Sequence, residues 1–108
     1  MANFQKERKR LQDVMLENAD VSMKRFLALD SRVYEDGALG RKEKELMGLV
    51  ASAVLRCDDC INYHLGTCWE AGVTDDELIE ALDIVLIVGG SITIPHVRRA
   101  IDHWKNMD

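Results

Sequence analysis

Apolar residues recur three and four positions apart along the first third of the chain, with charged residues between them. Leu11 and Val14 lie on one such stripe, which predicts a helix over about 4–18. A second stripe follows Asp20, a residue type that commonly caps helices, and predicts a helix to about Tyr34. The glycines of the next segment, YEDGALG, predict a loop.

A long helical region is predicted over about 41–71. Its middle, LMGLVASAVL, is apolar nearly all round. A helix without a polar face must be covered on every side, and one short chain has few elements to do so. We therefore expect subunits to associate. A break is expected between Arg56 and Asp59, where an aspartate can cap a new helix. Gly72 then ends the region.

The segment TDDEL has the sequence of a capping box, with Thr74 as the cap and Glu77 at the third helical position. It predicts a helix to about Val88. The end of this helix, LDIVLIV, would suit a strand by local propensity, but the cap favours a helix. A glycine pair breaks the pattern, and Pro95 suits the first turn of a last helix. The sequence thus predicts an all-α fold of five or six helices.

Composition narrows the function classes. The 108 residues suffice for a single domain, and a net charge of −5 argues against broad nucleic-acid binding. The longest apolar run has about 11 residues, short of the roughly 20 that cross a bilayer. The charged start of the chain has no apolar signal region, so we expect a cytoplasmic protein in a reducing compartment.

The segment RCDDCINYHLGTC contains all three cysteines and one of the three histidines. If it is helical, Cys57, Cys60, His64 and Cys68 share one face about 80° wide. They are also spread over about 16 Å of helix axis, at roughly 1.5 Å per residue. Zinc ligand atoms lie only about 2.0–2.3 Å from the metal, so one continuous helix cannot enclose an ion with these residues. We expect no metal and no other cofactor.

A redox pair fits this spacing better. Cys57 and Cys60 lie on adjacent turns, where a disulfide can close, and His64 can exchange a proton with the sulfur of Cys60. Cys68 has no partner in the sequence and is interpreted as a packing residue. The two aspartates between the paired cysteines should raise the thiol pKa unless they cap the helix or point away. The simpler alternative is that all these residues pack in a helix interface.

The stretch from Glu45 to His64, E-x11-C-D-D-C-I-N-Y-H, resembles the signature of the AhpD-like alkylhydroperoxidases, a branch of the carboxymuconolactone decarboxylase family. The similarity extends over about 41–100, whereas the first forty residues carry no comparable motif. It implies one all-α domain over 1–108, with N-terminal helices in 1–40 and a motif-bearing core in 41–108. It also implies homo-oligomers, often trimers or hexamers.

The resemblance further implies roles for four residues. Cys60 matches the attacking thiol, Cys57 matches the resolving thiol, and His64 with Glu45 matches a proton relay in which Glu45 is the final base. The substrate would be a peroxide or a disulfide. The reductant would be a dithiol, which in this family can be carried by a lipoyl-bearing protein. Family peroxidases have a histidine where this chain has Asp59, a difference that favours thiol–disulfide chemistry over full peroxidase activity.

Two other functions remain open from the sequence. One is a lyase that decarboxylates a small carboxylated lactone without using the cysteines; it would need cationic groups, for which the candidates are Arg56, His96, Arg98 and Arg99. The other is a non-enzymatic helical oligomer or redox sensor. A geometric question also remains, because a straight helix would place Glu45 about 18 Å before Cys57. Glu45 reaches the site only across a helix break or from a neighbouring subunit.

Overall fold

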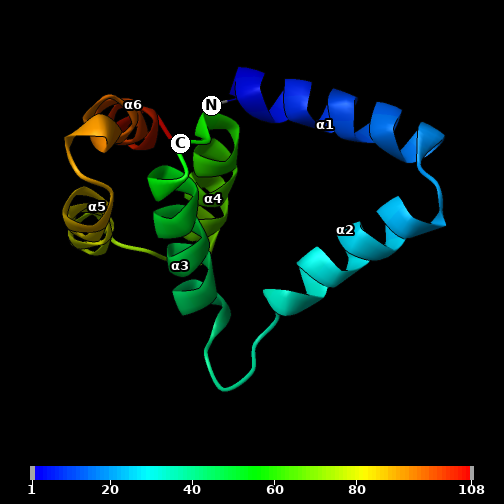
Figure 1. Ribbon diagram of the computed structural model, residues 1–108, viewed down its shortest axis with the longest axis horizontal. Coiled ribbons are helices and arrows are strands. Elements are labelled where there is room, and N and C mark those ends of the chain that lie inside the picture. The colour runs from blue at the N-terminus through cyan, green and yellow to red at the C-terminus, as the bar shows by residue number, and fades with distance from the viewer. Residues whose placement is uncertain (1, 108) are drawn as a thin grey trace.

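The computed structural model describes residues 2–107, which form six α-helices, one turn of 3-10 helix and no strand (Figure 1). The predicted all-α fold is therefore confirmed. Within the described range, no helix is both long enough and apolar enough to cross a bilayer. The elements are α1 (Ala2–Asn18), α2 (Val21–Val33), α3 (Arg41–Val54), α4 (Asp58–Glu70), α5 (Asp75–Gly89), η1 (Ser91–Thr93) and α6 (Ile94–Lys105).

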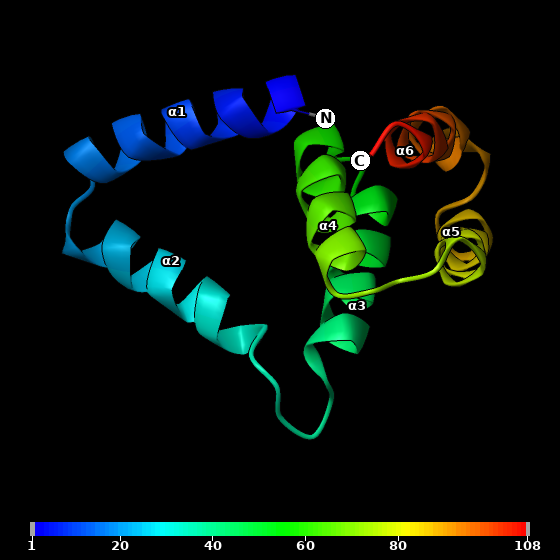
Figure 2. The same ribbon diagram turned by 180° about the vertical axis from the view of Figure 1, so that it is seen from behind.

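Helices α3 and α4 form the centre of the molecule, side by side and running in opposite directions (Figures 1 and 2). Helices α5 and α6 pack against this pair on one side. The side chains that meet there are apolar and almost completely buried, so their removal from water holds the four helices together. These core residues include Leu49, Ala53, Ile61, Leu65, Leu82, Val85 and Trp104.

Helices α1 and α2 form an arm on the other side of the α3–α4 pair (Figure 2). The arm returns to the pair at the first turns of α1 and at the end of α2. All of α2 lies in the described range, and none of its residues is buried. Its apolar stripe instead faces solvent in this single chain, with Phe26 69% exposed. The apolar pattern predicted the helices correctly, but no other part of this chain covers the apolar stripe of α2 in the described range.

The predicted break in the long helical region is confirmed, but its cap is not the predicted one. The chain reverses over residues 55–57, where Arg56 has a φ of 61° in the left-handed region. The residue that caps α4 is Cys57, whose sulfur accepts a hydrogen bond from the backbone N–H of Cys60 at 3.2 Å. Asp58 and Asp59 lie inside the first turn, where their charge still suits the positive end of the helix.

The other predicted helix boundaries follow local signals and are confirmed. Gly72, with a φ of 84°, follows the last residues of α4 in the left-handed conformation that glycine tolerates best. Thr74 and Glu77 form both bonds of the capping box at the start of α5. The β-branched segment before Gly89 stays helical, because α5 buries one face against the core through Val85.

Candidate functional site

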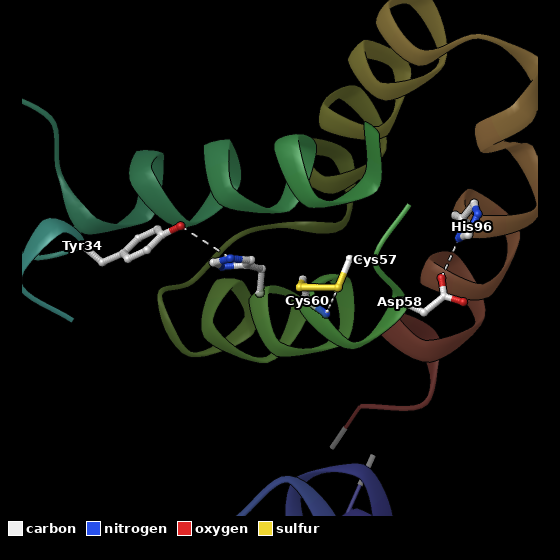
Figure 3. Close-up of a disulfide and its surroundings, with 6 residues drawn as sticks. Tyr34, Cys57, Asp58, Cys60 and His96 are labelled. Atoms are coloured by element: carbon white, nitrogen blue, oxygen red, sulfur yellow. Dashed lines mark hydrogen bonds and ion pairs between the residues drawn. A yellow bond between two sulfur atoms is a disulfide. The ribbon is translucent and has the colours of Figure 1, made fainter. Parts of the chain in front are cut away.

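Cys57 and Cys60 form a disulfide at the N-terminus of α4 (Figure 3). Their Cα atoms lie 5.3 Å apart. Cys57 is half-buried and caps the helix, while Cys60 is exposed. Once the pair is reduced, the positive end of the helix favours the thiolate form of a cysteine at this position.

His64 and Glu45 form a buried pair next to the disulfide. The His64 Nδ1 atom lies 3.1 Å from a carboxylate oxygen of Glu45, and the two residues are only 8% and 2% exposed. The chain reversal at residues 55–57 brings them together, because α3 and α4 then run antiparallel. Glu45 therefore reaches His64 within one chain. An ionised Glu45 accepts from Nδ1–H, which makes Nε2 the ring nitrogen of His64 that can accept a proton.

Tyr34, the residue that follows α2, brings a hydroxyl to the other side of the imidazole. Its oxygen lies 3.5 Å from His64 Nε2, and the two ring centroids are 5.3 Å apart. Burial, and then the charge of Glu45, raise the pKa of the Tyr34 phenol. Sequence reasoning missed this residue. Nothing in the sequence around Tyr34 ties it to a motif thirty residues later, and only the fold connects them.

A cavity of about 400 Å³ opens beside the disulfide. Of the two paired cysteines, it is Cys60 that lines the cavity, together with His64. The rest of the wall comes from α4, from α2 and from the first turns of α1. The lining residues are Phe4, Glu7, Arg8, Leu11, Asp30, Asp59, Cys60, Tyr63 and His64.

The basic run near the start of the chain contributes to this wall. Lys9 and Arg10 form ion pairs on the exposed surface of α1, as expected for a solvated helix face. Arg8 instead places its guanidinium 4.1 Å from the ring centroid of Tyr63, as in a cation–π interaction. The sequence pattern could not separate Arg8 from its neighbours, because all of them carry the same charge.

The two aspartates between the cysteines have different surroundings. Asp58 points toward α6, where His96 Nδ1 lies 2.7 Å away (Figure 3). Arg99 Nε donates to the same carboxylate at 3.1 Å. The hydrogen bond with His96, assisted by the charge of Arg99, lowers the pKa of Asp58. Asp59 is exposed and lines the cavity with Cys60. Only one of the two negative charges therefore faces the cavity.

Cys68 lies in the hydrophobic core, fully buried, and is a free cysteine. Burial, followed by the charge of Glu45, raises the pKa of its thiol to about 12. The prediction that Cys68 is a packing residue is confirmed. It takes no part in the arrangement around Cys60.

These features define an all-α protein with a Cys-x-x-Cys disulfide at a helix N-terminus, beside a buried carboxylate–imidazole pair. Residues 21–103 match the Carboxymuconolactone decarboxylase family, and the chain belongs to that family. The match includes α2, so the family relationship begins earlier in the chain than the motif alone predicted.

Solved structures show the same fold. The chain is 53% identical to TM1620 from Thermotoga maritima, with a TM-score of 0.95 over 97% of this chain and 92% of that one. A second crystal structure of TM1620 gives a TM-score of 0.90, and involvement of that family member in antioxidative response has been suggested. The apo form of lpg0406 from Legionella pneumophila, at 24% identity and a TM-score of 0.88, shares the fold over 96% of this chain and 93% of that one.

Two bacterial proteins match at lower identity than TM1620 does. An uncharacterized protein of the cox locus of Paracoccus denitrificans is 29% identical over 77% of this chain and 75% of its own length. An uncharacterized protein of Cupriavidus necator is 25% identical over 81% of this chain and 77% of its own length.

Proposed function

We propose that the protein is a thiol-dependent oxidoreductase that reduces hydroperoxides or disulfides through Cys57 and Cys60. The observation that carries this proposal is the shared cavity. Cys60 and His64 both line it, and His64 is hydrogen-bonded to a buried carboxylate. A thiol that can be attacked from solvent and a base that can take its proton are the two parts such a reaction needs.

The reaction consumes two thiols. Cys60 gives its proton to His64 Nε2, while Glu45 stabilises the imidazolium through Nδ1–H. The Cys60 thiolate attacks the terminal oxygen of a hydroperoxide and the O–O bond breaks. The departing oxygen takes the proton back from His64 and leaves as an alcohol, while Cys60 becomes a sulfenic acid. The Cys57 thiol then attacks the Cys60 sulfur and releases water as the disulfide forms. With a disulfide substrate, the intermediate is a mixed disulfide.

The assignment of attack to Cys60 and resolution to Cys57 rests on exposure. Cys60 is exposed and lines the cavity, so a substrate can reach its sulfur. Cys57 is half-buried and caps α4. A thiol in that position is better placed to close a disulfide with its neighbour than to meet a substrate first.

The surroundings of the aspartates favour the redox function. Because His96 and Arg99 pair with Asp58, its charge opposes thiolate formation less than the sequence suggested. The same pairing engages two of the four cationic residues that a lactone-decarboxylating lyase was expected to use. The suggested antioxidative role of the Thermotoga maritima relative also supports the redox function.

The reductant that we propose is an external dithiol, which a lipoyl-bearing protein could supply. Two successive thiol–disulfide exchanges would open the Cys57–Cys60 bond and release the reductant as its own disulfide. This chemistry operates in a reducing compartment, in line with the cytoplasmic location predicted from the cysteine pattern.

A homo-oligomer, a trimer or a hexamer, is also part of the proposal. Two apolar surfaces support it: the exposed stripe of the α1–α2 arm, and a groove between α3 and α5. The groove is lined entirely by apolar side chains: Leu46, Met47, Val50, Ala51, Val54, Leu55, Ala81, Ile84 and Val88. A groove lined only by apolar side chains, together with an exposed apolar stripe, is typical of an interface between subunits.

The test is a thiol count and intact mass after a stoichiometric dose of cumene hydroperoxide. Reduced wild type should lose two thiols and form the Cys57–Cys60 disulfide. Cys57→Ser should stop at a Cys60 sulfenic acid that dimedone traps, whereas Cys60→Ser should consume almost no peroxide. Peroxide consumption by Cys60→Ser at the wild-type rate would refute the assignment. Lactone turnover retained by the Cys57→Ser/Cys60→Ser double variant would favour the lyase instead.

A further inference from the structure

Both ring nitrogens of His64 have a partner in the structure. Nδ1 is 3.1 Å from Glu45. Nε2 is 3.5 Å from the Tyr34 hydroxyl, a contact drawn as a dashed line in Figure 3. The second distance is at the outer limit of a hydrogen bond, but bonds at catalytic groups are commonly long before substrate binds. Nε2 is the nitrogen that must accept the thiol proton of Cys60. In the described part of the chain, the hydrogen-bond partner of Nε2 is thus Tyr34, which directly follows α2 of the N-terminal arm.

Gly48 on α3 makes this contact possible. A Cβ atom at position 48 would lie 2.6 Å from the Tyr34 hydroxyl oxygen, 2.6 Å from His64 Cε1 and 2.9 Å from His64 Nε2. These distances are shorter than van der Waals contact, so an added methyl would displace the Tyr34 hydroxyl or the buried imidazole. Glycine at position 48 thus leaves the space that the tyrosine and the histidine share.

From this geometry we propose that Tyr34 is a positioning residue for the redox site, whose hydroxyl stabilises His64 in both of its protonation states, and that Gly48 is the residue that admits it. This inference rests on the proposed role of His64 as the base for Cys60.

The hydroxyl can serve both states because it is a donor and an acceptor. While His64 is neutral, Tyr34 donates O–H to the Nε2 lone pair. When the Cys60 proton moves to Nε2, the Tyr34 O–H rotates away from that lone pair, and the new N–H donates to the Tyr34 oxygen. The second bond is charge-assisted and stronger than the first, so the hydroxyl stabilises the imidazolium more than the neutral ring. It therefore favours the thiolate of Cys60. The raised pKa of Tyr34 keeps the hydroxyl protonated throughout.

Several other charged or titratable groups face His64 and act on the same equilibrium. Glu45 and Arg41 approach from α3, with Arg41 Nε 4.0 Å from the second carboxylate oxygen of Glu45. The ring of Tyr63 lies edge-on at 5.3 Å. The groups that line the shared cavity are Glu7, Arg8, Asp30, Asp59 and Cys60. A change at Tyr34 leaves all of them in place.

The experiment measures the rate of Cys60 alkylation by iodoacetamide against pH. It uses the reduced full-length chain in a Cys57→Ser background, in which Cys60 is the reactive thiol because Cys68 is buried. In Tyr34→Phe we expect the midpoint of the rate profile to move to higher pH by about one unit, with up to a roughly tenfold lower rate at pH 7. Gly48→Ala should shift the profile in the same direction, because the added methyl separates Tyr34 from His64.

Two matched variants separate this role from general effects. Ser22→Ala also removes a hydroxyl from the N-terminal arm, at an exposed position of α2, and its profile midpoint should stay at the pH of the parent variant. Gly66→Ala is a glycine-to-alanine change in the neighbouring helix, where the new Cβ would meet only Gln5 at an ordinary 3.5 Å. Its profile should also stay in place.

A Tyr34→Phe profile that coincides with the parent profile overturns the inference, as does an equal shift in Ser22→Ala. Alkylation requires no peroxide, so the outcome is independent of the proposed function. If the profile shifts as expected but no peroxide or disulfide is turned over, the proposed function fails and the role of Tyr34 stands. If peroxide or disulfide is turned over but the profile does not move, the role of Tyr34 fails and the proposed function stands.

Discussion

The imidazole of His64 and the carboxylate of Glu45 meet at 3.1 Å, although they belong to two helices that run in opposite directions. A straight helix would have kept Glu45 about 18 Å from the start of the cysteine motif. The reversal over residues 55–57, with Arg56 in the left-handed region, removes that separation. This short irregular segment thus allows one chain to bring the imidazole and the carboxylate together.

Glu45→Gln should impair the reactivity of Cys60 strongly. Glutamine keeps the shape of the side chain but removes the charge that stabilises the imidazolium. We expect alkylation and substrate turnover at pH 7 to fall roughly 100-fold, the lower end of the range for general base catalysis. Glu43→Gln, an exposed change on the same helix, is the control and should react as wild type does. Equal rates for the two variants would remove Glu45 from the relay.

Asp58→Asn should lower stability at neutral pH and change how stability depends on pH. The pKa of Asp58 is lowered in the folded chain, first by His96 and then by Arg99. The ionised carboxylate therefore contributes stability above its unfolded value of about 3.9, and this contribution is lost as pH falls through the folded value. Because the side chain is 44% exposed, we expect about 1 kcal/mol or less at pH 7.

Thermal unfolding of the Asp58 variant and wild type between pH 3 and pH 7 checks this prediction. The two Tm curves should be separated near neutral pH and converge toward pH 3. Asp59→Asn, at the exposed neighbouring position, should lie closer to wild type than Asp58→Asn, because it loses only the interaction with the helix end. A constant separation between Asp58→Asn and wild type would show that the carboxylate charge is not what stabilises the fold.

Cys68 should be unreactive in the folded protein. Its pKa of about 12 leaves almost no thiolate below about pH 10, and core packing blocks access to the sulfur. Thiol counting on the reduced protein at pH 8 should find two reactive groups in buffer and three in guanidinium chloride. A third group that reacts in buffer would mean that the core opens around α4.

Substitutions at Cys57 should separate its capping role from its redox role. Both Cys57→Ser and Cys57→Ala prevent the disulfide, but serine can accept the Cys60 N–H as the sulfur does. We expect Cys57→Ala to be about 1 kcal/mol less stable than Cys57→Ser, with equal loss of turnover. Chemical denaturation under reducing conditions measures the difference. Equal stability would mean that the sulfur does not act as a cap.

A charge in the α3–α5 groove should disrupt the proposed oligomer. Ile84 lines the groove and is half-exposed in the single chain, so Ile84→Glu would bury a charge in any interface formed there. Light scattering should show a lower mass for Ile84→Glu than for wild type. Asp83→Asn, the adjacent position outside the groove lining, should keep the wild-type mass. A monomeric wild type would refute the oligomer itself.

The helices could be predicted because their signals are local. The capping box at Thr74 and the end of α4 at Gly72 each depend on residues within one helical turn of each other. A short stretch of sequence is therefore enough to predict them. The cap of α4 was predicted wrongly for a related reason. Aspartate is the commoner cap, but the position of the reversal decided which residue stands first, and that residue is Cys57.

The sequence by itself determined the all-α fold, the helix boundaries and the spacing that pairs Cys57 with Cys60, because these depend on neighbours along the chain. Only the tertiary structure decided which residues surround that pair. Tyr34 contacts His64 from thirty residues away, and His96 pairs with Asp58 from thirty-eight. Such contacts depend on how the antiparallel helices pack and where the arm returns, and no local pattern of charge or hydrophobicity encodes either.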